Sequence, residues 1–299
     1  MTINTPLGDY RWIENWITVP KTENARTHGV AVTKAGRIII FHQANPAVLI
    51  YSPEGKLLDS WGDFPGAHGL TLVEENDTEY LWLTDEKTLQ VVKTTLQGDI
   101  VQSLPVPKHP EYTGKKYIPT SAAPTPDGDI WVADGYGAHL VHRYDAGGRQ
   151  IQTIDGTDGA GRFKCPHGLA LDTRGSEPEI YIADRGNKRF QVYGTDGRYR
   201  RSFGEDFLTS PDVSFSAGKL LVVPELISRV SILDHNDQPV ALFGANDDVN
   251  HLPGWPNNRE NVTSGKFNSP HSATADSAGN IYVVEWITGG RITKLEKIS

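Results

Sequence analysis

Four short strand-like segments joined by turns lie between residues 166 and 204. GLALD and IYIAD are rich in strand-forming residues, RFQVYG alternates polar and apolar positions, and RYRRSFG closes the series. The connections TRGSEPE and RGNK and an Asp-Gly pair carry turn chemistry. This order predicts four antiparallel strands connected by hairpins.

The same pattern recurs along the whole chain. The first strand of each repeat begins at an equivalent position, and these positions follow one another at 40, 52, 47, 45 and 59 residues. They are His28, His68, Thr120, His167, Asp212 and His271. The second strands align as well, at residues 37–43, 80–86, 129–135, 179–185, 220–226 and 280–286. Repetition at this period predicts an all-β, six-bladed β-propeller with four-stranded antiparallel blades around a central channel.

A closed ring of blades predicts one domain over residues 1–299. Its first and last blades have to protect their strand edges. Segment 10–20, YRWIENWITVP, precedes the first repeat, and we expect it to add the outermost strand to the last blade. The polar insertions 108–118 and 244–269 are expected to be loops that lead to inner strands.

Composition narrows the classes of partner. The net charge of −8 argues against a nucleic-acid partner. The sequence contains no apolar run of 18 residues, so we expect no membrane span. A single cysteine, Cys165, excludes an internal disulfide and suits a reducing compartment. The first residues show no secretory signal. We therefore expect a cytoplasmic monomer that binds a small molecule.

Four of the ten histidines occupy the six equivalent positions. A single histidine there could serve packing or capping, whereas four together indicate a metal site. Alternate blades lie about 120° apart in a closed six-bladed ring, so His68, His167 and His271 would converge on the channel. Three imidazoles with an open fourth position are typical of catalytic zinc, although other divalent transition metals accept the same ligands. His28 is either a substrate contact or a structural residue.

The residues that follow the second strands should lie at the same rim as the histidines, because antiparallel pairing places them beside the first-strand starts. Tyr136 stands between two glycines, which would let its phenol project freely. Arg185 either binds an anionic group or pairs with a nearby acid. Cys165 is expected to be a buried structural thiol. Candidate substrate-binding positions are His28, Gln43, Asp212, Glu225 and Trp286.

The motifs PHGLALD and IYIADRGNKRFQVY and the Asp-Gly hairpins resemble those of NHL-repeat propellers. Within that group the whole chain is similar to peptidyl-α-hydroxyglycine α-amidating lyases, the lyase domain of peptidylglycine α-amidating enzymes. The resemblance implies zinc on His68, His167 and His271. It also implies a catalytic tyrosine in a DGY motif, here Tyr136, and a functional arginine in an ADR motif, here Arg185.

The sequence departs from that pattern at two positions. Gln43 follows Phe41-His42 where the family has a second functional arginine, so the amidating substrate is left open. Ser272 follows His271 where the family has an aspartate that helps to bind calcium, so calcium is not expected.

Three functions are compatible with these residues. The first is a zinc-dependent lyase acting on a small carbinol or α-hydroxy substrate, with an acidic group as one option. The second is a metal-dependent hydrolase, such as a lactonase. The third is a non-catalytic NHL scaffold, which would not need three symmetric histidines. Loop 244–269, with Trp255 and Arg259, is expected to determine the substrate.

Overall fold

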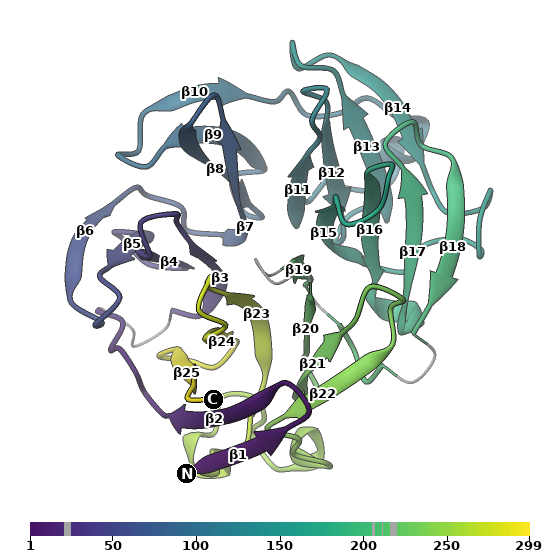
Figure 1. Cartoon of the computed structure of the whole chain (residues 1–299). Helices are drawn as coiled ribbons and strands as arrows, with labels where there is room; N and C mark the ends of the chain where they lie inside the picture. Colours follow the sequence, from purple (N-terminus) through teal and green to yellow (C-terminus); the bar gives the residue numbers. More distant parts are fainter. Residues whose placement is uncertain (21–24, 205–206, 211, 216–219) are drawn as a thin grey trace. The chain divides into compact units, whose positions relative to one another are not determined.

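The structure is a computed structural model that describes residues 1–20, 25–204, 207–210, 212–215 and 220–299. Its fold is a six-bladed β-propeller with almost no helix, as the repeats predict (Figure 1). Residues 211 and 216–219, which belong to the predicted first strand and turn of the fifth repeat, lie outside the described residues. Within the described ranges, no helix is long and apolar enough to span a membrane.

The chain divides into two compact units. A middle unit, Phe64–Phe207, holds blades two to four, and a terminal unit, Met1–Asp63 with Leu208–Ser299, holds blades one, five and six. The predicted single domain over residues 1–299 stays a prediction.

The middle unit contains three four-stranded antiparallel sheets. Blade two comprises β7 (Ala67–Glu75), β8 (Thr78–Asp85), β9 (Gln90–Thr95) and β10 (Ile100–Ser103). Blade three comprises β11 (Ser121–Pro124), β12 (Ile130–Asp134), β13 (Leu140–Tyr144) and β14 (Gln150–Ile154). Blade four comprises β15 (Pro166–Asp172), β16 (Glu179–Asp184), β17 (Arg189–Gly194) and β18 (Tyr199–Phe203).

The terminal unit contains the other three sheets. Blade one comprises β3 (Thr27–Val32), β4 (Ile38–His42), β5 (Val48–Tyr51) and β6 (Leu57–Trp61). Blade five comprises β19 (Ser214–Phe215), β20 (Leu221–Glu225), β21 (Arg229–Leu233) and β22 (Pro239–Phe243). Blade six comprises β23 (Pro270–Ala275), β24 (Ile281–Glu285) and β25 (Arg291–Lys297), together with β2 (Gly8–Ile13) and β1 (Thr2–Thr5).

The first strands of the chain complete blade six, as the sequence predicts. Strand β2 pairs antiparallel with β25, with Trp12 opposite Leu295, and it covers an edge that would otherwise be exposed. The Trp12 ring packs against Phe267 at 4.7 Å between ring centroids. The outermost strand is β1, which pairs with β2, so the predicted segment 10–20 contributes the strand next to the outermost one.

Short 3-10 helices occupy the two long loops. They are η1 (Pro110–Thr113) in the first loop and η3 (Val249–His251) and η4 (Arg259–Asn261) in the second. A fourth, η2 (Arg185–Asn187), forms the turn after β16. Because each spans one turn, the fold stays all-β, as expected.

Apolar side chains of the second and third strands form the core between neighbouring blades of a unit. In the middle unit, Trp131 and Val141 of blade three pack with Ile180, Ile182 and Tyr193 of blade four, and all are at most 1% exposed. These strands are buried on both faces, so they read as apolar runs instead of alternating ones. This explains the uniformly apolar second strands of the sequence.

A buried carboxylate ends the second strand in five of the six blades. Each of these carboxylates accepts backbone N–H groups of the loop that leads to the inner strand of its own blade. They belong to residues that are 0% exposed: Asp85, Asp134, Asp184, Glu225 and Glu285. Blade one has His42 at this place, and its Nε2 donates to the Pro46 carbonyl at 2.7 Å.

Glu225 therefore has a structural role in blade five, and its predicted role in substrate binding stays a prediction. Its carboxylate accepts the backbone N–H of Leu208 at 2.6 Å and the Arg229 Nε–H at 2.6 Å. Both contacts tie blade five together, and the side chain is fully buried.

Replacing Glu285 tests the importance of these carboxylates. Glu285 accepts from Ser269 N at 3.0 Å and pairs with Arg291 Nη1 at 2.9 Å, and Arg291 is only 2% exposed. Glu285→Ala would remove the nearer anion of a buried guanidinium and leave it only Glu14 at 3.7 Å, so we expect a loss of about 3–5 kcal/mol in unfolding free energy. Equilibrium urea unfolding measures it. The control is Glu177→Ala, which removes an exposed pair with Arg200 and should cost at most about 1 kcal/mol. Equal losses in both variants would contradict the structural role.

Candidate active site

Four histidines lie at shifts in the strand pairing, near the start of the inner strand of their blades. Pairing shifts between Ala67 and Leu70 around His68, and between Pro166 and Leu169 around His167. The same shift occurs around His28 in β3 and around His271 in β23. A bulge of this kind redirects a side chain out of the regular alternation. Blade three, which has Thr120 at this position, pairs regularly from Ser121 onward.

In the middle unit, His68 and His167 lie next to each other with their ring centroids 4.6 Å apart. The phenolic oxygen of Tyr136 lies 2.8 Å from His167 Nε2 and 3.2 Å from His68 Nε2. The three side chains thus meet at their polar ends, although they come from three different blades.

Hydrogen bonding fixes the tautomer of His68. Its Nδ1 donates to the backbone carbonyl of Thr120 at 2.8 Å, so the lone pair is on Nε2. The pKa of His68 is lowered to about 4, mainly by burial and also by the neighbouring Arg185 charge, against the opposing effect of the Thr120 hydrogen bond. His68 is therefore a neutral imidazole at pH 7, with Nε2 able to accept a proton or bind a metal.

Arg185 contacts the tyrosine from its other side. Its Nη1 lies 3.3 Å from the Tyr136 hydroxyl, and its guanidinium carbon lies 5.2 Å from the ring centroid. Burial raises the pKa of Tyr136 to about 12, while the Arg185 charge favours the phenolate. Tyr136 thus keeps its proton at neutral pH and can donate it to an imidazole nitrogen.

The glycines around Tyr136 serve close packing. A Cβ on Gly135 would lie 2.6 Å from the Pro166 carbonyl oxygen, and one on Gly137 would lie 2.2 Å from the Lys116 carbonyl oxygen. Neither glycine has the positive φ that would favour glycine by itself. The expectation of a freely projecting phenol is therefore replaced by a tightly held one, because the Tyr136 ring is packed between His68, His167 and Arg185.

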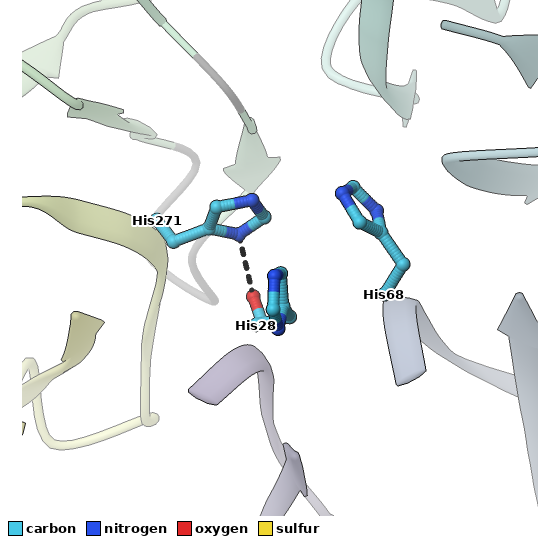
Figure 2. A group of neighbouring side chains, drawn as sticks. All are labelled: His28, His68 and His271. Atoms are coloured by element: carbon cyan, nitrogen blue, oxygen red, sulfur yellow. Dashed lines mark hydrogen bonds between the residues drawn. The ribbon is translucent and has the colours of Figure 1, made fainter. Parts of the chain in front are cut away.

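In the terminal unit, His28 and His271 form a second histidine pair, with ring centroids 4.6 Å apart. His271 Nδ1 donates to the His28 carbonyl at 2.9 Å, as Figure 2 shows. This bond repeats the one from His68 to Thr120: in each case the histidine of one blade donates to the residue at the equivalent position of the following blade. His68 and His271 are thus held in the same way.

Three other predicted substrate-binding residues of the terminal unit, Asp212, Gln43 and Trp286, make different kinds of contact. Asp212 is half-buried, burial raises its pKa to about 6, and Ser272 donates a hydrogen bond to it. The Gln43 backbone N–H donates to the Arg26 carbonyl, and the Trp286 ring lies under the Arg26 guanidinium. Arg26 and Thr120 could not be identified as backbone acceptors from the sequence, since both contacts join separate segments of the chain.

Two side chains of loop 244–269 are engaged in holding the loop. Trp255 Nε1 donates to the Asn268 carbonyl at 2.9 Å. Arg259 Nη1 donates to the Thr288 and Gly290 carbonyls at 2.9 and 3.2 Å. The Trp255 contact lies within the loop, and the Arg259 contacts attach the loop to the β24–β25 connection of blade six. Their predicted role in substrate choice stays a prediction.

The structure thus brings His68, His167, Tyr136 and Arg185 together within the middle unit, and His28 and His271 within the terminal unit. The triad of His68, His167 and His271 draws on both units and stays a prediction.

Similarity to known proteins identifies the family. No protein-family model matches the chain. The chain is 30% identical over 254 residues to human NHL repeat-containing protein 3, covering 75% of this chain and 69% of that protein. The chain belongs to the NHL-repeat family. This NHL-repeat protein is also 30% identical over 204 residues to a Caenorhabditis elegans protein named probable peptidyl-alpha-hydroxyglycine alpha-amidating lyase, with 58% of this chain and 57% of the relative covered.

Solved structures share the fold at low identity. A gluconolactonase from Xanthomonas campestris matches with a TM-score of 0.67 at 14% identity, over 100% of this chain and 98% of that one. A streptogramin B lyase matches with a TM-score of 0.65 at 12% identity, over 97% and 98% of the two chains. At these identities the similarity shows the propeller architecture of this NHL-repeat protein and leaves its chemistry open.

The reactivity of Cys165 reports on the environment of Arg185. The thiol is half-buried, and burial raises its pKa even though Arg185 lies beside it. At pH 8 the group stays below this raised pKa and is mostly the unreactive thiol. We expect its alkylation rate to keep rising beyond pH 9, whereas guanidinium-unfolded protein should follow an ordinary thiol. A rate that levels off below pH 8.5 in the folded protein would contradict this environment.

Proposed function

We propose that this protein is a metal-dependent enzyme of the lyase type, acting on a small carbinol or α-hydroxy substrate in the manner of its amidating-lyase relatives. One observation carries the proposal: the Tyr136 hydroxyl lies within hydrogen-bonding distance of Nε2 of both His68 and His167, with Arg185 beside it. A scaffold that only binds a partner has no need for this buried acid–base cluster.

The histidines are suited to hold a metal. His68 and His271 each donate Nδ1–H to a backbone carbonyl, so Nε2 is the nitrogen that would bind an ion, and such outer hydrogen bonds are typical of metal-binding histidines. We propose that His68, His167 and His271 bind Zn²⁺ and leave a position open, while iron, copper, manganese or nickel is an alternative. When bound, the ion would supply Lewis-acid chemistry.

Tyr136 is proposed to transfer the proton of the reaction at its phenolic oxygen. It is protonated at rest because burial outweighs the Arg185 charge. The adjacent guanidinium stabilises the phenolate whenever the proton leaves, so one group can serve as acid and then as base. Arg185 is also in position to stabilise an oxyanion next to Tyr136.

A hydrolase of the lactonase type is the second candidate, and Asp212 favours it. This carboxyl has a pKa raised to about 6, which brings it near the range useful for a general base. Comparing an α-hydroxyglycine derivative with a lactone as substrates separates the two reactions, because an amide product requires the lyase.

Replacing the tyrosine tests its role in proton transfer. Tyr136→Phe keeps the ring and removes the hydroxyl, so turnover should fall by about 10²–10⁴-fold with bound metal unchanged. The matched control, Tyr199→Phe, changes a tyrosine that packs on Tyr193 and should retain activity. Product formation and metal content are measured on the same samples. Full activity in Tyr136→Phe would remove this residue from the mechanism.

Histidine replacements test the proposed ligand set. Alanine at His68, His167 or His271 should each remove most of the metal measured by elemental analysis of protein purified without chelator. Melting temperatures should change little, because the strand ladders hold the blades. His28→Ala is the matched control and should retain most of the metal. Metal-free native protein, or equal loss in all four variants, would overturn this assignment.

A further inference from the structure

Arg26 lies just before β3, two residues ahead of His28, and its backbone is held on two sides. Its carbonyl accepts the Gln43 N–H at 3.0 Å and the His28 Nδ1–H at 3.3 Å. The Gln43 side chain is uncharged, whereas Arg26 places a positive charge at this edge of blade one. The Arg26 backbone is thus held by His28, which lies in β3, and by Gln43, which directly follows β4.

The Arg26 guanidinium has no anionic partner among the residues that the structure describes. It lies over the Trp286 ring at 4.7 Å, which shields one of its faces. Its Nη2 reaches Asn257 Oδ1 at 3.4 Å, but that oxygen already accepts from the Thr288 hydroxyl at 2.7 Å. Its Nε is buried and makes no hydrogen bond within the described part of the chain.

Other half-buried or buried arginines of the terminal unit are paired. Arg229 pairs with Glu225 at 2.6 Å, and Arg291 pairs with Glu285 at 2.9 Å. Among the described residues, no carboxylate forms an ion pair with Arg26. A buried donor without an acceptor is destabilising, and the loss is greater for a charged donor. The unused Nε–H is therefore a binding capacity that a ligand can satisfy.

The geometry points to a carboxylate as that ligand. The Nε and Nη2 edge of a guanidinium presents two parallel donors, which match the two oxygens of a carboxylate. With Trp286 against one face, a ligand approaches in the guanidinium plane. One guanidinium balances one negative charge, which favours a carboxylate over a phosphate dianion.

We propose that Arg26, supported by Trp286 and Asn257, binds the carboxylate of a small-molecule ligand and determines specificity for acidic substrates. The inference rests on the proposed function in one respect, namely that the bound carboxylate belongs to the substrate.

The experiment measures binding instead of turnover. Full-length protein, as purified and again after chelator treatment, is titrated with N-acetylglycine and with its uncharged analogue N-acetylglycinamide. Calorimetry gives the affinity, and the ¹⁵N Nε–H signal of Arg26, assigned by its loss in Arg26→Lys, reports the contact. We expect this signal to shift saturably with N-acetylglycine only.

The variants separate charge from geometry. Arg26→Gln should weaken N-acetylglycine binding at least about tenfold, and Arg26→Lys should weaken it too because the planar fork is lost. The matched control Arg198→Gln, at a side chain that is 85% exposed, should bind as the parent does. If Arg26→Gln does not fold by circular dichroism, Arg26→Lys carries the test.

Three results would overturn the proposal. They are equal binding by Arg26→Gln and the parent, equal binding of the amide analogue, and tighter binding of inorganic phosphate at the same Nε–H. Because the measurement needs neither metal nor turnover, a failure here leaves the Tyr136 and histidine tests standing. A failure of those tests likewise leaves carboxylate binding at Arg26 to be judged by itself.

Discussion

The buried carboxylate at the end of the second strand is the interaction on which five of the six blades depend. In five blades it accepts backbone N–H groups from the segment that enters the inner strand, and it is 0% exposed. Removing a carboxylate from water is costly unless its oxygens are fully hydrogen-bonded, and these donors meet that requirement. The loop before the inner strand is therefore held in one place, and so is the first residue of that strand.

The candidate site uses that fixed point. Asp85 accepts the Gly66 N–H, two residues before His68, and Asp184 accepts the Lys164 N–H, three residues before His167. A bulge then turns each histidine out of the ladder. The loops are thereby anchored without help from a ligand, which is how a protein arranges a site before its substrate arrives.

Family membership and site chemistry give different kinds of information about this protein. The relatives and structural neighbours of this protein include propellers named as lyases and as a lactonase. The fold alone therefore does not select a reaction. The selection depends on particular groups. A protonated tyrosine between two imidazoles and a guanidinium supports proton transfer. An arginine that stacks on tryptophan and has no anion among the described residues supports carboxylate binding.

The number of blades, their strands and the positions of the histidines can be predicted from the sequence alone. Each of these features is local: apolar strand segments, turn residues and a repeating start position are readable within about fifty residues. Predictions stayed open where a side chain's partner is remote in the chain. Glu225 is expected at the rim, and only the structure shows that its carboxylate accepts hydrogen bonds from Leu208 and Arg229. Three contacts are visible only in the tertiary structure. The Thr120 carbonyl orients His68, and the Tyr136 hydroxyl lies within hydrogen-bonding distance of both His68 and His167. Arg26 stacks on Trp286. Such contacts join segments 31 to 260 residues apart, and only the packing of blades brings their atoms within bonding distance.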